Sequence, residues 1–179
     1  THPNRTKRLA AIAKGFNKAK TELDKYQTKT LTAEDYFYRA LDAPREQYQY
    51  RLDNYNIAIQ KNPNYTWAYN NRGNLKKDMG NLPGALQDFN KAISLESLDE
   101  CYYNRGNTYL AMGKKIEAMQ DYNKCLEINP KHAKALVNSG TLWKEVKDYD
   151  QAISNYRQAI KIYPTFDASN SLGNAYGGK

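Results

Sequence analysis

The sequence predicts an all-α solenoid assembled from helix-turn-helix repeats. A short motif carries this prediction: Asn71-Arg72-Gly73-Asn74 returns as Asn104-Arg105-Gly106-Asn107, then as Asn138-Ser139-Gly140-Thr141 and Ser171-Leu172-Gly173-Asn174, at steps of 33, 34 and 33 residues. A fixed period in this range indicates one structural unit stacked on its own copies. Composition agrees, because 26% of the 179 residues are charged and an array whose units touch only their neighbours needs a thin core. No apolar run approaches the ~18 residues that would cross a bilayer.

Residues 1–31 come first and are expected to form a basic amphipathic helix. Within residues 1–30, eight Lys and Arg stand against Glu22 and Asp24, which gives this arm +6 of the chain's net +8. Its apolar residues recur at helical spacing and form one stripe. The stripe consists of Leu9, Ile12, Ala13, Phe16, Ala19, Leu23 and Tyr26. The basic side chains named as candidate contacts are Arg5, Lys7, Arg8, Lys14, Lys18 and Lys20.

Three interpretations of this arm stay open. It could be a capping helix that packs its stripe on the first repeat and leaves its lysines in water. It could lie on an anionic lipid surface, although Phe16 is its one aromatic residue suited to insertion. It could contact phosphates or an acidic partner, with a steep salt dependence. Base-stacking aromatic motifs are absent, so nucleic acid is the least favoured partner.

Each repeat is expected to hold two helices and a break. In the third copy, helix A runs from about Asp99 to Met112, the chain turns at Gly113-Lys114, and helix B runs from about Ile116 to Ile128. Asn129-Pro130 ends the unit, because proline cannot donate to the helical ladder and restrains the residue before it. The expected units are an atypical first repeat at 32–65, repeats at 66–98, 99–132 and 133–165, and a capping helix or truncated fifth repeat at 166–179.

The first repeat departs from the others. Ala40 replaces the glycine, the turn at Ala43-Pro44 is one residue short, and Arg51 stands where a small residue is expected. We therefore expect its two helices to splay apart.

A glycine in the middle of each A helix requires a packing reason, since it costs roughly 1 kcal/mol relative to alanine. We expect the glycines to face small residues in helix B, so that the two helix axes approach closely. The facing residues would be Ala85, Ala118 and Ala152, and the aromatic residues four positions on, Phe89, Tyr122 and Tyr156, would fill the remaining space.

This spacing resembles the tetratricopeptide repeat, whose pattern places large residues, glycine and tyrosine in helix A and alanine, an aromatic residue and proline in and after helix B. The third copy matches at Tyr102, Gly106, Tyr109, Ala118, Tyr122 and Pro130, and the fourth at Leu136, Gly140, Trp143, Ala152, Tyr156 and Pro164. The second matches at Tyr69, Gly73, Ala85 and Phe89, but has Lys76 for the aromatic residue of helix A. The resemblance implies a right-handed solenoid whose A helices line a concave groove.

In such arrays the groove binds an extended peptide. An asparagine amide carries both a donor and an acceptor, so a row of them can pair with peptide groups of any sequence. The same row could equally be inherited family consensus without a ligand, and both readings stay open. The residues that the resemblance places in the groove are Asn71, Asn74, Asn104, Asn107, Asn138, Thr141 and Asn174, with Trp67, Asn70, Tyr103, Lys77, Lys134 and Lys144 around them.

A carboxylate clamp for heat-shock chaperone tails, known in this family, is not expected. Asn74, Asn104 and Lys134 match its pattern, but Asn70 and Asn138 replace two cationic residues. Charge-assisted hydrogen bonds are the strong ones, so their loss removes most of the clamp.

The remaining features bound the function. Tyrosine is abundant at 16 residues, and the cluster of Tyr36, Tyr38, Tyr48 and Tyr50 in the first repeat is a second candidate docking edge. Cys101 and Cys125 are expected to be buried free thiols. The spacing of residues along the chain contains no catalytic, cofactor-binding or metal-binding motif, so we expect no enzymatic activity, no cofactor and no metal.

The sequence therefore predicts a non-catalytic scaffold for protein–protein interaction, acting as adaptor, assembly factor or accessory subunit of a larger complex. The Asn-Arg-Gly-Asn motif of helix A resembles repeats common in bacterial and organellar members of the family, which suggests a place on a membrane-bound complex. The chain begins at Thr1 without an initiator methionine, which is compatible with a processed organellar or exported protein. A membrane-surface, nucleic-acid or acidic-partner binder acting through the basic arm is the alternative function.

Overall fold

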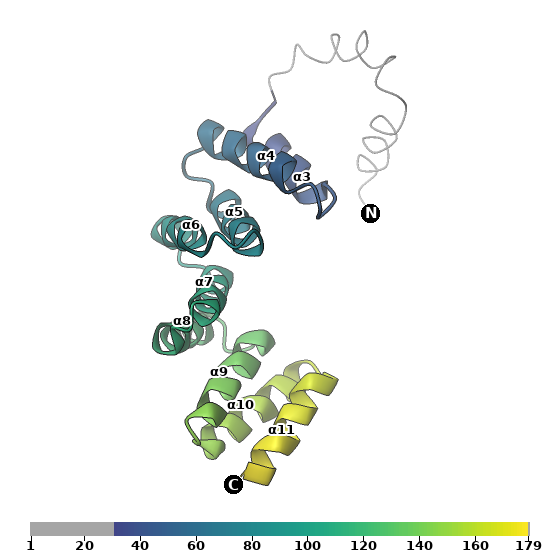
Figure 1. The fold of residues 1–179 in the computed structure, drawn as a ribbon, viewed down its shortest axis with the longest axis vertical. Helices are drawn as coiled ribbons and strands as arrows, with labels where there is room; N and C mark the ends of the chain where they lie inside the picture. The colour runs from purple at the N-terminus through teal and green to yellow at the C-terminus, as the bar shows by residue number, and fades with distance from the viewer. Residues whose placement is uncertain (1–30, 179) are drawn as a thin grey trace. The chain divides into compact units, whose positions relative to one another are not determined.

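The computed structural model describes residues 31–178. Residues 1–30 and 179 lie outside the described residues, and with them the predicted basic arm. The described part holds nine α-helices and no strand (Figure 1). In chain order these are α3 (Ala33–Asp42), α4 (Tyr48–Lys61), α5 (Thr66–Asp78), α6 (Leu82–Leu95), α7 (Asp99–Ala111), α8 (Lys115–Ile128), α9 (Ala133–Glu145), α10 (Tyr149–Ile162) and α11 (Phe166–Gly178).

Successive helices pack in pairs. The pairs are α3 with α4, α5 with α6, α7 with α8, and α9 with α10. The second helix of each pair packs on the first helix of the next, and α11 packs on α10 and α9. We call α3, α5, α7, α9 and α11 the A helices, and α4, α6, α8 and α10 the B helices. The predicted all-α repeat solenoid is confirmed.

Left-handed residues end three A helices. Gly80 and Gly113 have φ values of +80° and +74°, and Lys147 stands at the same place after α9 with a φ of +63°. After the last of these, the backbone N–H of Asp148 donates to the carbonyl of Trp143 at 3.0 Å, which satisfies a helix-end carbonyl. A lysine in this conformation is strained, because its Cβ crowds the backbone.

An aromatic ring of the B helix fills the space beneath the central glycine in α5, α7 and α9. A Cβ added at Gly106 would lie 2.8 Å from a ring carbon of Tyr122. The sequence predicts alanine opposite these glycines, and that expectation is wrong in part: Ala118 contributes its backbone oxygen, 3.3 Å from the same point, while the ring makes the closest contact. The equivalent pairs are Gly73 with Phe89, at 2.8 Å, and Gly140 with Tyr156, at 2.9 Å.

Two repeats are each held by a partly buried ion pair between their own helices. Arg105 of α7 donates from Nε and Nη2 to both carboxylate oxygens of Asp121 in α8, at 2.8 and 2.7 Å. Its remaining nitrogen, Nη1, donates to Asn90 of α6 at 2.7 Å, so one guanidinium links three helices. The preceding repeat repeats the arrangement with Arg72, Asp88 and Asn56.

The fourth repeat replaces this ion pair with a neutral hydrogen bond. Ser139 stands in the place of the arginine and Asn155 in the place of the aspartate. The Asn155 amide donates to the Ser139 hydroxyl at 3.1 Å. Both partners change together, because an arginine or an aspartate left alone in this partly buried place would be an uncompensated charge.

The first pair, α3 and α4, packs closely. Phe37 and Ala40 of α3 share one buried cluster with Tyr55 and Ala58 of α4. Arg51 does not separate the helices as the sequence suggests, because its Nε reaches out to donate to the carbonyl of Ala40 at 3.2 Å. The long stem of arginine thus allows a packed pair where splayed helices were expected.

Candidate binding surface on the A helices

The polar row of the A helices surrounds the buried hydroxyls of the B-helix tyrosines. The Tyr122 hydroxyl of α8 donates to Asn107 Oδ1 of α7 at 2.8 Å. Asn138 of α9 donates to the same Asn107 oxygen at 2.9 Å and to the Tyr122 hydroxyl at 3.3 Å. The tyrosine is fully buried, and burial raises its pKa to about 12. Asn107 and Asn138 therefore satisfy a hydroxyl that would otherwise lack a partner.

The same arrangement recurs at the neighbouring junctions. The Tyr156 hydroxyl lies 3.1 Å from the Thr141 hydroxyl, and Ser171 of the next A helix is a further polar neighbour. Tyr55 has Asn71 of the next A helix as a polar neighbour. The row thus supplies a polar neighbour to each of the fully buried B-helix tyrosines, Tyr55, Tyr122 and Tyr156.

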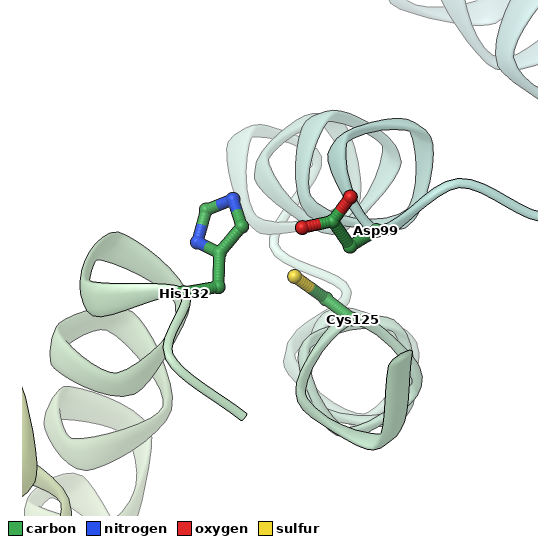
Figure 2. A group of neighbouring side chains, drawn as sticks. All are labelled: Asp99, Cys125 and His132. Carbon is green, nitrogen blue, oxygen red and sulfur yellow. The ribbon is translucent and has the colours of Figure 1, made fainter. Parts of the chain in front are cut away.

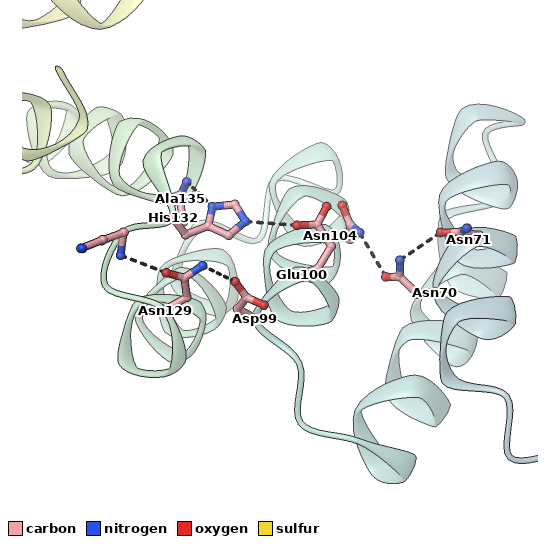
Figure 3. A network of polar contacts seen from close by, with 9 residues as sticks. Asn70, Asn71, Asp99, Glu100, Asn104, Asn129, His132 and Ala135 are labelled. Atoms are coloured by element: carbon pink, nitrogen blue, oxygen red, sulfur yellow. Dashed lines mark hydrogen bonds and ion pairs between the residues drawn. The ribbon is translucent and has the colours of Figure 1, made fainter. Parts of the chain in front are cut away.

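In α6 the place of the tyrosine is taken by Phe89, which has no hydroxyl, and the hydrogen bonds of the row differ there. Asn104, next to it in the series, donates instead to Asn70 Oδ1 at 3.1 Å, and Asn70 donates to Asn71 Oδ1 at 3.2 Å (Figure 3). Asn70 and Asn104 are only 1% and 6% exposed. These two amides are therefore internal links between α5 and α7, with little surface to offer a ligand.

Side chains next to this row form much of the exposed surface of the A helices. Trp67 is 43% exposed in the first turn of α5, and Lys134 is exposed in the first turn of α9. Lys77 and Lys144 are half-buried near the ends of α5 and α9. Of the row itself, Asn174 is exposed, and Asn71, Asn74, Asn107, Asn138 and Thr141 are half-buried.

Tyr103, also named from the sequence, packs within a ring cluster. Its centroid lies 4.7 Å from that of His132 and 6.1 Å from that of Tyr122. Of the residues that match the chaperone clamp pattern, Asn104 is bound to Asn70.

The tyrosine cluster of the first pair is divided by the fold. Tyr38, Tyr48 and Tyr50 are 50%, 42% and 47% exposed. Tyr36 is half-buried, with Arg39 and Lys61 lying 5.5 and 5.7 Å from its ring centroid. Three of the four tyrosines are thus accessible from solvent.

An apolar cleft between α8 and α9 was not anticipated from the sequence. It encloses about 260 Å³ and has Met119, Leu142 and Trp143 among its lining residues. Ile116 and Val146, at its edge, are 75% and 68% exposed. Apolar residues beside the turn of each repeat could have indicated such a cleft in the sequence. Only the fold, however, brings α8 and α9 together.

A cluster of metal-ligating side chains was also not predicted from the sequence. Asp99, Cys125 and His132 bring one ligand atom each to within 4.8 Å of the others (Figure 2). They are separated by 26 and 7 residues, which matches no metal motif. Burial, and after it the Asp99 and Glu100 carboxylates, raise the pKa of the Cys125 thiol to about 12. Cys125 and Cys101 are buried free thiols, as predicted.

The structure contains no helix, among the residues it describes, with the length and apolar character needed to cross a bilayer.

Stacked helix pairs and a repeated glycine–aromatic fit define a helical-repeat protein. Tetratricopeptide repeat models match residues 68–97, 100–132 and 133–166, which is more than half of the chain. The chain therefore belongs to the tetratricopeptide repeat family. It is 32% identical over 117 residues to tetratricopeptide repeat protein 6 of Homo sapiens, a match that covers 65% of this chain and 22% of that protein. The chain thus spans less than a quarter of the length of this relative.

Solved structures share the fold. MamA has a TM-score of 0.70 at 23% identity, over 82% of this chain and 81% of that one. A tetratricopeptide repeat protein from Parabacteroides merdae has a TM-score of 0.70 at 22% identity, over 81% of this chain and 60% of that one. The first TPR of Spaghetti (RPAP3), bound to an HSP90 peptide, has a TM-score of 0.60 at 20% identity, over 63% and 90%. At these identities the likeness concerns the fold alone.

Proposed function

We propose that this protein is a non-catalytic scaffold that binds a peptide segment or partner surface on its A helices, as an adaptor, assembly factor or accessory subunit. The family and its stacked repeats support the class. One observation carries the site: the hydrogen-bonded row fixes the A helices against their neighbours and leaves an aromatic and several cationic side chains around it. A rigid surface of this kind orders only the ligand on binding, which lowers the entropic cost of association.

The contacts are assigned by accessibility. Trp67 supplies the anchor, since tryptophan is enriched among residues that dominate binding energy. Lys77, Lys134 and Lys144 supply positive charge that favours acidic side chains or a carboxylate in the ligand. Asn74 and Asn174 are the row amides proposed to pair with peptide groups, and Asn70 and Asn104 are proposed to act as framework. The exposed edge of Tyr38, Tyr48 and Tyr50 is a second docking surface of the same partner.

A charge-reversal comparison tests the A-helix surface. Peptides selected on the full chain from a displayed library would be measured against a variant with Lys77→Glu, Lys134→Glu and Lys144→Glu. The matched control carries Lys91→Glu, Lys124→Glu and Lys161→Glu, which place the same charge change on exposed positions of the B helices. Binding should be lost in the first variant and kept in the second. Equal loss in both would refute the assignment of the surface.

The basic arm supports an alternative function as a binder of anionic surfaces. Its +6 charge lies within residues 1–30, and the rest of the chain carries only the remaining +2. The test compares the full chain with a chain that lacks residues 1–30 on vesicles with and without phosphatidylserine. Loss of anionic-vesicle binding with the arm, and its suppression by salt, are expected. If partner binding survives both the deletion and high salt, the scaffold function does not depend on the arm.

A further inference from the structure

Three ligating side chains from separate elements meet where the third repeat joins the fourth. Asp99 begins α7, Cys125 lies in the last turn of α8, and His132 immediately precedes α9. Figure 2 shows their side chains converging on one space. We propose that the Asp99–Cys125–His132 cluster binds a divalent transition-metal ion, with Zn²⁺ as the preferred ion. This site is independent of the proposed peptide-binding surface.

The donor set fits this ion. Thiolate, imidazole and carboxylate are the side-chain ligands of zinc, and three protein ligands leave one position for water or a fourth donor. In a tetrahedral site with bonds of about 2.0–2.3 Å, neighbouring donors lie roughly 3.3–3.8 Å apart. The three ligand atoms already lie within 4.8 Å of one another. Closing the site therefore needs movements of roughly 1 Å, within reach of side-chain rotation.

Hydrogen bonds already orient two of the ligands. Asn129 donates to Asp99 Oδ2 at 2.7 Å. His132 Nδ1 accepts from the backbone N–H of Ala135 at 3.2 Å, and Nε2 lies 3.2 Å from the Glu100 carboxylate (Figure 3). A metal ion has to replace one of these two imidazole contacts. The Glu100 side chain is 45% exposed, so it is free to turn and to supply an oxygen ligand or a partner for the imidazole.

The surroundings favour a cation. Two carboxylates lie at the cluster: Asp99 is one of its ligands, and a Glu100 oxygen lies 3.2 Å from His132 Nε2. A divalent ion would compensate this negative charge and stabilise the thiolate that it binds. The Cys125 side chain is fully buried, so the ion would be partly shielded from water.

Neighbouring repeats lack this set and provide natural replacements. Ala92 and Ala159 stand at the places that correspond to Cys125. Thr165 corresponds to His132, and its hydroxyl accepts from the N–H of Ala168 at 3.2 Å as the His132 ring accepts from Ala135. A bound ion would join α7, α8 and α9 and fix the third repeat against the fourth. No other junction within residues 31–178 has such a group.

Cobalt serves as the spectroscopic probe. The metal-stripped, untagged full chain would be titrated with Co²⁺ without oxygen, followed by displacement with Zn²⁺ and by native mass spectrometry. We expect one ion per chain, a thiolate-to-cobalt charge-transfer band and the visible bands of tetrahedral cobalt. Zn²⁺ should also raise the melting temperature, because it binds the folded state.

Three substitutions separate the site from general damage. Cys125→Ala and His132→Thr install residues of the neighbouring repeats, and each should weaken zinc affinity by more than about tenfold. Cys125→Ala should also abolish the charge-transfer band. Cys101→Ala removes the buried thiol outside the cluster and should leave band and affinity unchanged.

Several results would overturn the proposal. A wild-type chain that binds no Co²⁺ at micromolar concentration, or binds it without a charge-transfer band, has no such site. Unchanged zinc affinity in Cys125→Ala or His132→Thr would assign the ion to other residues. Loss of the band in Cys101→Ala would move the thiolate ligand to the other cysteine.

Discussion

Replacement of Gly106 by alanine is expected to destabilise the protein, while the same replacement at Gly173 is expected to stabilise it. Both glycines occupy the same place in an A helix. A Cβ at Gly106 would lie 2.8 Å from the Tyr122 ring and 3.3 Å from the backbone oxygen of Ala118, whereas a Cβ at Gly173 would meet nothing within 4 Å. The pair therefore separates the cost of crowding from the intrinsic gain of alanine over glycine.

The magnitudes follow from three contributions. Alanine in a helix gains about 1 kcal/mol over glycine at either site. At Gly106, overpacking costs about 1–3 kcal/mol. Tyr122 cannot move away freely, because its ring is fully buried and its hydroxyl is bonded to Asn107 and Asn138. Losing one of these bonds costs about 1 kcal/mol more. We expect Gly106→Ala to destabilise by about 2 kcal/mol and Gly173→Ala to stabilise by up to about 1 kcal/mol.

Urea unfolding followed by circular dichroism measures both changes. The midpoint should fall for Gly106→Ala and rise for Gly173→Ala, with the slope unchanged if both variants unfold as the wild type does. A Tyr122→Phe background should lessen the loss at Gly106, because the ring is then no longer held by its hydroxyl. Stabilisation by both alanines would show that the glycine–aromatic fit is not tight.

Three further predictions concern charge, turn geometry and pH. Asp121→Asn should destabilise the folded protein by about 2–3 kcal/mol in urea unfolding, because it leaves Arg105 without its carboxylate. Adding Arg105→Ser, which copies the Ser139–Asn155 pair, should recover part of the lost stability. Absence of any recovery would contradict this explanation. Lys147→Gly should stabilise by about 1 kcal/mol, since its φ of +63° is strained for lysine, and Gly113→Lys should do the reverse. With chelator present, the free energy of unfolding should fall as pH rises above about 9, because the Cys101 and Cys125 thiols ionise near 9.0 when unfolded and near 12 when folded. A variant with Cys101→Ala and Cys125→Ala should delay this fall toward pH 10, where tyrosine titration begins; an unchanged profile would exclude the thiols as its cause.

Periodicity alone predicted the helix pairs. The repeated glycine, the aromatic residue of helix B and the closing proline are local signals, and each depends on the residue type at a fixed offset. The observed third pair, α7 from Asp99 to Ala111 and α8 from Lys115 to Ile128, differs from the prediction by one residue at two helix ends. The partner of the glycine was less well predicted, because sequence spacing does not say which of two nearby side chains turns beneath it.

The asparagine row shows where sequence reasoning ends. Its recurrence every 33 or 34 residues was visible, and both a peptide ligand and inherited family consensus without a ligand were compatible with it. The structure places Asn107 and Asn138 on the Tyr122 hydroxyl, and turns Asn104 toward Asn70 where Phe89 has none. This preference arises from burial: a hydroxyl removed from water requires a partner, and the row supplies it.

The sequence by itself determined that this protein is a solenoid of tetratricopeptide repeats, because period, glycine and proline act within one unit or between adjacent units. The tertiary structure decided which polar side chains are internal and which face solvent. It also brought Asp99, Cys125 and His132 within 4.8 Å of one another. Such groupings depend on the packing of three helices at one junction, and no spacing along the chain encodes that distance.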